Sequence, residues 1–208
     1  MLAFTYKNNT DEVTVGIDEA GKGCMIGRVY AAAVVWDNTK DPSGIKDSKK
    51  ISRKNRKLLK EYIETNALAY GVGWATNEEI NDMNISNATF LAMHRALDKL
   101  NIPFDRILVD GNRFKPYKCH VHNCIIGGDD LFVNIAAASI LAKEYHDEWI
   151  QNEFADDTKY DLINNKGYGT KKHIEGIKTH GVTPFHRTLY CSKYMTQEYH
   201  EVNAFHET

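Results

Sequence analysis

Two adjacent carboxylates, Asp18 and Glu19, are the side chains in this sequence best suited to chemistry. They end an apolar, β-branched stretch over residues 13–17, which predicts a buried strand, and a glycine loop over residues 21–23 follows at once. Buried carboxylates are costly unless something pairs with them, and a divalent metal ion is the obvious partner. Glycines let the backbone approach a ligand closely, so exposed N–H groups can hold an anion or a hydroxyl. The segment therefore predicts a site for a metal ion together with a phosphate or a sugar.

Six segments, taken in chain order, resemble motifs of the ribonuclease HII family. The first reads Gly-Ile-Asp-Glu-Ala-Gly-Lys-Gly at 16–23, where the family usually has arginine in place of the lysine. The others are Lys-Asp-Ser-Lys-Lys-Ile-Ser at 46–52, Val-Asp-Gly-Asn-Arg at 109–113, Asp129 followed after seven residues by Ala-Ala-Ser-Ile-Leu-Ala-Lys at 137–143, Gly-Tyr-Gly-Thr at 167–170 with His173 after it, and the span from His180-Gly181 to His186-Arg187. The resemblance covers about residues 13–189, and the motifs together are specific.

Strands and helices must position these segments. Apolar and β-branched runs predict strands at about Val13–Ile17, Val29–Trp36, Leu68–Ala75, Arg106–Val109 and His120–Ile126. Their order among helical segments indicates an α/β protein. The resemblance implies the ribonuclease H-like fold, a five-stranded mixed sheet flanked by helices, in a single domain over 1–208. Its core would span about 13–155, and a C-terminal helical extension about 156–208.

Capping residues predict where the helices begin. The first predicted helix is capped by Ser52 and has the apolar face Leu58, Leu59, Tyr62 and Ile63. A second helix begins with a capping box of Thr76 and Glu79, and a third, capped by Ser86, buries Phe90, Met93, Leu97 and Leu100. A long helix runs from Asp129 through Ile135, Ile140 and Trp149, and a short one from Thr170 to Gly181.

Four acids are expected to converge on one spot. Asp18 and Asp110 end two strands that lie side by side in ribonuclease H-like sheets, and Glu19 follows where the strand gives way to the loop, so it need not point to the opposite face. Asp129 would enter from the start of the long helix. The family spacing before the Ala-Ala-Ser run selects Asp129, which leaves Asp130 as an extra acid in the first turn. Such a site favours Mg²⁺ or Mn²⁺, which prefer oxygen ligands.

The resemblance implies phosphodiester hydrolysis by two divalent ions about 3.5–4 Å apart, with 5′-phosphate and 3′-hydroxyl products. Its metal ligands and catalytic residues would be Asp18, Glu19, Asp110 and Asp129. Substrates would be RNA–DNA hybrids and duplex DNA that contains single ribonucleotides, cut on the 5′ side of the ribonucleotide, as in ribonucleotide excision repair. We expect a monomer, which suits an enzyme that binds around a duplex.

Substrate recognition is also implied by the resemblance. Gly21, Lys22 and Gly23 would contact the ribose 2′-hydroxyl, which distinguishes RNA from DNA, and Tyr168 would stack on the next sugar. The remaining substrate-binding candidates are Lys46, Lys49, Arg113, Ser139, Lys143 and Arg187, with salt bridges, solvent exposure or helix hydrogen bonds as their alternatives.

Two positions depart from the family pattern. Lys22 replaces arginine and lacks its planar fork, and Gly169 replaces a proline and would loosen the loop. We expect both to weaken the recognition of a ribonucleotide junction without abolishing cleavage.

Composition excludes several classes. The chain has 208 residues, 42% hydrophobic and 26% charged, with a net charge of −2, which fits a globular protein with one core. No apolar run is long enough to span a bilayer and the sequence begins with no signal-peptide pattern, so we expect a cytoplasmic protein with no membrane partner. Basic residues cluster over 46–60 and 166–172 and could bind phosphates, although a lone cluster of this kind is usually a solvated surface. The polar tail from about Met195 contains no recognisable clamp-binding peptide.

The cysteines, at 24, 119, 124 and 191, are expected to be reduced. Residues 119–124 read Cys-His-Val-His-Asn-Cys, but the usual Cys-x₂-Cys spacing of zinc sites is missing. We therefore expect a strand there, with small core thiols and surface histidines.

Three other functions were weighed. A ribonuclease HIII-like enzyme would cleave hybrids with poor junction recognition, but that family carries an extra N-terminal domain. A non-catalytic hybrid-binding protein would gain nothing from four convergent acids. A nucleotide-binding kinase or ATPase would need a Gly-x₄-Gly-Lys-Ser/Thr loop, which the sequence lacks.

Overall fold

The computed structural model of the protein describes residues 2–9 and 11–195 of the chain. The strands are β1 (Thr14–Ala20), β2 (Val29–Val35), β3 (Ala69–Ala75), β4 (Arg106–Asp110) and β5 (Val121–Ile125). The helices are α1 (Arg53–Asn66), α2 (Asn77–Leu97), α3 (Val133–Glu153), α4 (Leu162–Asn165), α5 (Lys171–His180) and α6 (Thr188–Cys191), with 3₁₀ turns η1 (Tyr6–Asn8), η2 (Ser48–Lys50), η3 (Gly128–Asp130) and η4 (Ser192–Tyr194). The expected polar tail beyond Met195 lies outside the described residues.

The five strands form one mixed sheet in the order β3-β2-β1-β4-β5. Strands β1, β2 and β3 pair antiparallel, whereas β4 pairs in parallel with both β1 and β5. The predicted strand positions are confirmed to within a few residues because each strand is an apolar run between turn residues. One consequence matters for the site: the carboxyl ends of β1 and β4 lie at the same edge of the sheet.

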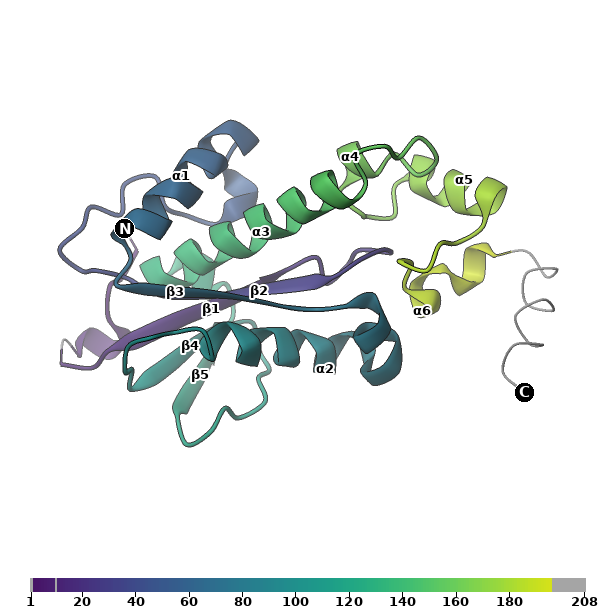
Figure 1. The fold of residues 1–208 in the computed structure, drawn as a ribbon. Helices are drawn as coiled ribbons and strands as arrows, with labels where there is room; N and C mark the ends of the chain where they lie inside the picture. Colours follow the sequence, from purple (N-terminus) through teal and green to yellow (C-terminus); the bar gives the residue numbers. More distant parts are fainter. Residues whose placement is uncertain (1, 10, 196–208) are drawn as a thin grey trace.

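Helices cover both faces of the sheet (Figure 1). Helix α2 packs on one face, where Ile17, Val109 and Met93 join a single apolar cluster. Helices α1 and α3 cover the other face, where the alanine-rich part of α3 packs against β1 and β2. Small side chains on α3 let the helix approach the sheet closely, so the site at the end of β1 is held between two packed layers.

Three predicted helix starts are confirmed. The side chain of Ser52 accepts a hydrogen bond from the backbone N–H of Asn55 and begins α1. Thr76 and Glu79 form the reciprocal bonds of a capping box at the start of α2. The side chain of Thr170 accepts a hydrogen bond from the backbone N–H of His173 and begins α5.

Other helix predictions were wrong in detail. A second helical segment follows within α2 after a break at Asn84, whose φ is 69°, but its cap is Asn84 and not Ser86, since the Asn84 side chain accepts hydrogen bonds from the N–H groups of Ser86 and Asn87. Asp129 does not begin the long helix either, since it lies in η3 and α3 starts at Val133. In α1, Leu58 is 57% exposed rather than part of the apolar face.

The histidine and cysteine segment over residues 119–124, most of which lies in β5, also differs from expectation. Cys119 and Cys124 are exposed, not core thiols. His120 stacks on Phe104 with ring centroids 4.3 Å apart, and Cys119 and His120 lie in a turn because β5 begins only at Val121.

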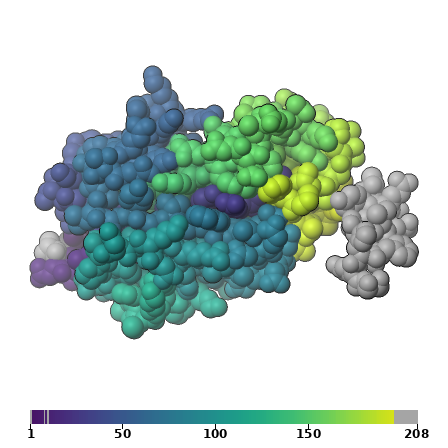
Figure 2. Space-filling view, in the orientation of Figure 1, coloured from purple at the N-terminus to yellow at the C-terminus, as the bar shows by residue number. Residues whose placement is uncertain are grey.

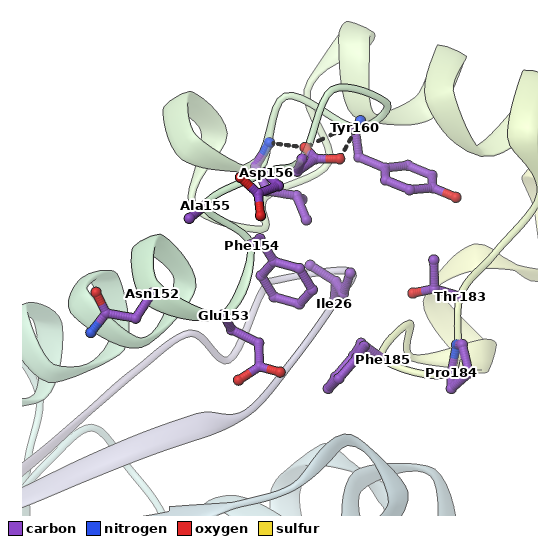
Figure 3. A pocket seen from close by; sticks show the side chains of 12 residues that line it. Ile26, Asn152, Glu153, Phe154, Ala155, Asp156, Tyr160, Thr183, Pro184 and Phe185 are labelled. Atoms are coloured by element: carbon purple, nitrogen blue, oxygen red, sulfur yellow. Dashed lines mark hydrogen bonds between the residues drawn. The ribbon is translucent and has the colours of Figure 1, made fainter.

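The C-terminal segment, formed by α4, α5, α6 and η4, packs against the end of α3. Its apolar contacts with the core include Ile26, Ile150 and Ile177. Figure 3 shows the pocket of about 360 Å³ at this junction, where Phe154 and Phe185 lie edge to face with their ring centroids 5.3 Å apart. Within the described part of the chain, no helix is both long and apolar enough to cross a membrane.

Candidate active site

Asp18 and Asp110 lie side by side at one edge of the sheet. Ile17 of β1 is the register partner of Val109 of β4, so the next residue on each parallel strand is one of the two acids. Asp18 is only 6% exposed, while Asp110 is partly buried. Asp110 Oδ1 accepts a hydrogen bond of 2.8 Å from the N–H of Gly128, which ties the end of β4 to η3.

Glu19 lies on the other side of the strand from Asp18. Because β1 continues through Ala20, the two side chains alternate across the sheet, contrary to our expectation that the strand ends before Glu19. Glu19 lines a small cavity of about 90 Å³ together with Asp110 and Arg113, next to α2. Asp18 instead faces α3, where Ser139 donates a hydrogen bond that lowers its pKa.

Asp129 reaches the same region from η3. It is 6% exposed, and burial, followed by the charges of Asp110 and Asp47, raises its pKa. Its neighbour Asp130 is half exposed and forms a salt bridge of 2.6 Å with Lys50. The two adjacent acids therefore have different surroundings, and only Asp129 is buried beside the other acids.

Asp18 is the most perturbed acid of the group. Burial raises its pKa well above the ordinary value, and repulsion from Glu19 and Asp110 raises it further. The N–H of Glu19 donates a 2.7 Å hydrogen bond to Asp18 Oδ1, which offsets only part of this cost. Several carboxylates are thus held together, and their charges disfavour one another.

Hard divalent cations fit this donor set, because they prefer carboxylate oxygens and would remove the repulsion. Among the described residues, however, no group of three or more His, Cys, Asp or Glu side chains is already gathered closely enough to hold a metal ion.

Asp47 is an acid that the sequence analysis did not assign to the site. It is 8% exposed in the turn before η2, where its side chain accepts the N–H of Lys49. The hydroxyl oxygens of Ser48, the next residue, and Ser139 lie 2.9 Å apart, within hydrogen-bond distance. The position of Asp47 within the motif at 46–52 was the only sequence signal for a role in the site. Tertiary packing brings Asp47 near Asp129.

The glycine loop is shaped by a buried histidine beneath it. Gly21 has φ +84°, and a Cβ added there would lie 2.4 Å from Cδ2 of His146. Lys22 is exposed, and its Nζ lies 3.4 Å from Glu19 Oε1. A glycine is required at position 21 for both its backbone conformation and this close approach.

Tyr168 lies next to the glycine loop. It is 39% exposed, forms an isolated antiparallel bridge with Cys24, and its ring would lie 3.7 Å from a Cβ added to Gly23. Lys143 Nζ lies 5.3 Å from the centre of the Tyr168 ring and 2.7 Å from Asp147 Oδ1. The structure therefore brings Lys143 to the tyrosine instead of leaving it in solvent.

Arg187 lies behind the loop rather than on its surface. It is completely buried, and its guanidinium donates hydrogen bonds to the carbonyl oxygens of Lys22, Gly27 and Arg28, at 2.9 to 3.1 Å. Lys46, Lys49 and Arg113, in contrast, are exposed. These three are free to meet a phosphate backbone, whereas Arg187 has used its donors within the protein.

One face of the molecule is hollowed (Figure 2). Figure 2 shows purple atoms of the N-terminal region at the bottom of a hollow between the green α3 region, the blue-teal α2 region and the yellow C-terminal segment. Lys22, Gly23 and Tyr168 are exposed, and Lys22 lies beside Glu19. The larger pocket in Figure 3 lies elsewhere and is lined by none of these residues.

Comparisons with known proteins agree on a single family. The family model described as Ribonuclease HII matches residues 15–193. Ribonuclease HII of Phocaeicola vulgatus is 47% identical over 182 residues, covering 88% of this chain and 90% of that protein. Ribonuclease HII of Christiangramia forsetii is 49% identical over 179 residues, covering 86% and 90%.

Solved structures share the fold. Ribonuclease H2 from Pyrococcus horikoshii superimposes with a TM-score of 0.69 at 23% identity, covering 87% of this chain and 96% of that one. Bst-RNase HIII in complex with Mn²⁺ also has a TM-score of 0.69, at 21% identity, covering 88% and 69%. The predicted ribonuclease H-like fold, a five-stranded mixed sheet flanked by helices, is confirmed.

Proposed function

Because the chain belongs to the ribonuclease HII family and is therefore an endonuclease that hydrolyses RNA in RNA–DNA hybrids, we propose that it also incises duplex DNA on the 5′ side of single ribonucleotides. The observation that supports this proposal is the juxtaposition of the acid group with the glycine loop and Tyr168. The acids supply the hydrolytic centre, and the loop and tyrosine supply the contacts that select a ribose.

In this proposal the catalytic and metal-binding residues are Asp18, Glu19, Asp110 and Asp129. Two Mg²⁺ or Mn²⁺ ions held there would act as Lewis acids that generate a nucleophile from water and stabilise the charge developing on the phosphate. The carboxylates orient the reacting groups, and their mutual repulsion favours the bound ions. The products would carry 5′-phosphate and 3′-hydroxyl ends.

Recognition of the ribose would come from the loop over residues 21–23. The backbone at Gly21 and Gly23 contacts the 2′-hydroxyl, and Tyr168 stacks on the sugar that follows. Lys46, Lys49 and Arg113 neutralise phosphates along the duplex, which makes binding depend on salt concentration. Ser139 and Lys143 act on Asp18 and Tyr168 from within the protein.

The assignment of Arg187 follows from its burial. A guanidinium that donates to the carbonyls of Lys22, Gly27 and Arg28 holds the recognition loop in shape and does not itself meet the substrate. We therefore give Arg187 a positioning role in place of the phosphate contact that the motif suggested.

One experiment separates this function from its alternatives. Duplex DNA with a single ribonucleotide and an all-RNA strand hybrid are incubated with the protein and Mg²⁺ or Mn²⁺, with EDTA and the Asp110→Asn variant as controls. Incision on the 5′ side of the ribonucleotide, lost in both controls, supports the proposal. Cleavage of the hybrid alone indicates a ribonuclease HIII-like preference, and tight hybrid binding without any cleavage indicates a binding protein.

A further inference from the structure

Two buried histidines form a chain of hydrogen bonds that ends on Tyr168. His173 Nδ1 lies 3.0 Å from the carbonyl oxygen of Tyr168, and His173 Nε2 lies 3.2 Å from His186 Nε2. At the other end, the N–H of Thr183 donates to His186 Nδ1 at 2.9 Å. Both imidazoles are at most 1% exposed, so no solvent substitutes for these bonds.

The chemistry of the two ends fixes every proton in this chain. The carbonyl oxygen of Tyr168 can only accept, so His173 carries its proton on Nδ1. The N–H of Thr183 can only donate, so His186 Nδ1 is unprotonated. Two neutral rings then leave one arrangement, in which His186 donates from Nε2 to the lone pair on His173 Nε2.

We propose that His173 and His186 are positioning residues, two neutral imidazoles of defined tautomer that hold the backbone of Tyr168 and thereby set the selectivity for a ribonucleotide junction. The inference deepens the proposed function and rests on it, because Tyr168 is there assigned to the sugar.

The C-terminal segment that carries His186 also holds the glycine loop beside Tyr168. His186 forms an isolated β-bridge with Ile26, and the next residue, Arg187, holds the carbonyl of Lys22. The tyrosine and the glycine loop are therefore anchored by consecutive residues, His186 and Arg187. A shift of the histidine pair would move Tyr168 relative to Gly23.

The surroundings of the pair favour its neutral form. Burial lowers the pKa of both histidines, that of His186 to about 4. The groups facing the pair are the ring of Tyr160, 4.9 Å from that of His186 between centroids, and the carboxylate of Asp157, whose charge acts in the opposite direction and is smaller in effect. Figure 3 shows Tyr160 beside Thr183 at the wall of the junction pocket.

The tautomers can be measured without any substrate. Long-range proton–nitrogen NMR spectra of the full chain, assigned with His173→Asn and His186→Gln, should show His173 protonated on Nδ1 alone and His186 on Nε2 alone from about pH 7 down to about pH 5. An inverted tautomer or a charged ring in this range would overturn the proposal. This readout stays valid even if the wild-type protein does not incise single ribonucleotides.

Selectivity is tested with a matched pair of substitutions at His173. His173→Asn keeps a donor near the Nδ1 position, whereas His173→Leu is of similar size and cannot donate. We expect His173→Leu to lower kcat/KM on the single-ribonucleotide duplex by roughly tenfold or more and on the all-RNA hybrid by less than about threefold. His173→Asn should stay within about threefold of wild type on both substrates, as should His180→Asn, an exposed control on the same helix.

A double-mutant cycle distinguishes positioning of Tyr168 from general loss of structure. In a Tyr168→Ala background, His173→Leu should change junction cleavage by less than about twofold, because the group it positions has gone. Additive losses, or equal losses on both substrates, would overturn the proposal. If His173→Leu does not fold, His173→Gln takes its place, because the glutamine amide reaches the Nε2 position of the histidine but not the carbonyl of Tyr168. Unchanged selectivity in His173→Gln would also overturn the proposal.

Discussion

The carboxylate of Asp18 shows how the fold supports a function at a cost to its own stability. It is buried beside Glu19 and Asp110, and both burial and these charges raise its pKa. The hydrogen bonds from the N–H of Glu19 and from Ser139 do not balance them. Bound divalent ions would offset the repulsion between these carboxylates, so we regard this cluster as the centre of the proposed activity.

Residue types and spacing single out the four acids and Tyr168 as candidates, because these residues belong to motifs that are read locally, and their roles stay a prediction. Residue types and spacing were not enough for Arg187 or Asp47. Arg187 resembles a surface phosphate contact in the sequence, and only the packed structure shows its donors turned to three carbonyl groups. Asp47 comes close to Asp129 through tertiary contacts that no local pattern records.

Lys22 gives the first prediction at this scale. Its side chain is half exposed and reaches Glu19, while its carbonyl is held by Arg187. Lys22→Arg should therefore leave the loop in place and raise single-ribonucleotide cleavage by up to about threefold, or leave it unchanged, since arginine adds a planar pair of donors. Steady-state kinetics on the single-ribonucleotide duplex measure this; a large loss would mean that the lysine contributes in a way specific to this chain.

A second prediction concerns Gly21, for which Gly127 is a matched control glycine. Both glycines have positive φ, +84° and +67°, but only a Cβ at Gly21 would strike another group, His146. Gly21→Ala should lower hybrid cleavage by roughly a hundredfold, while Gly127→Ala costs only backbone strain of about 1–2 kcal/mol and retains most activity. Comparable activity in the two variants would contradict the close packing of the loop on His146.

At the scale of elements, strands and helix caps were predictable and transitions between elements were not. Apolar runs located all five strands, and Ser52, Thr76 and Thr170 cap the helices that they were expected to cap. The kink at Asn84 and the 3₁₀ turn that carries Asp129 were missed, because both depend on how the chain meets the sheet. The division between a core and a C-terminal segment near residue 155 stays a prediction.

A buried ion network joins helices α1 and α3. Arg56, 8% exposed, lies 2.5 Å from Glu144 and 3.3 Å from Asp147, and both carboxylates are buried as well. Arg56→Ala should destabilise the protein by about 3–5 kcal/mol, because it leaves uncompensated buried charges. Chemical denaturation of Arg56→Ala beside Arg53→Ala, an exposed neighbour, provides the measurement; equal stability of the two variants would show that the network contributes nothing.

At the scale of the whole molecule, the C-terminal segment packs against the end of α3. It reaches back to α2, where Asn77 Nδ2 donates to the carbonyl of Pro184, and to the loop through Arg187. The proposed function assigns substrate recognition to core and segment together, with the histidine pair buried between them.

The buried histidines make global stability depend on pH. His186 has an ordinary pKa of 6.5 in the unfolded chain and about 4 in the folded one, so the unfolded chain binds the proton more tightly. The free energy of unfolding therefore falls as the pH is lowered from 6.5 to about 4, by on the order of 3 kcal/mol in all. Above pH 6.5 His186 makes no pH-dependent contribution. Denaturation at about pH 7 and about pH 5 should show a smaller loss for His186→Gln than for wild type. Equal losses would indicate that His186 is already charged in the folded protein.

The measurement that tests the central claim most directly is single-turnover cleavage of an RNA–DNA hybrid by single substitutions of the acids. We predict that Asp18→Asn, Glu19→Gln, Asp110→Asn and Asp129→Asn each lose roughly a hundredfold or more, while Asp130→Asn, adjacent in sequence but paired with Lys50 on the surface, stays within about threefold of wild type. Retained activity in Asp129→Asn together with a large loss in Asp130→Asn would contradict the site described above.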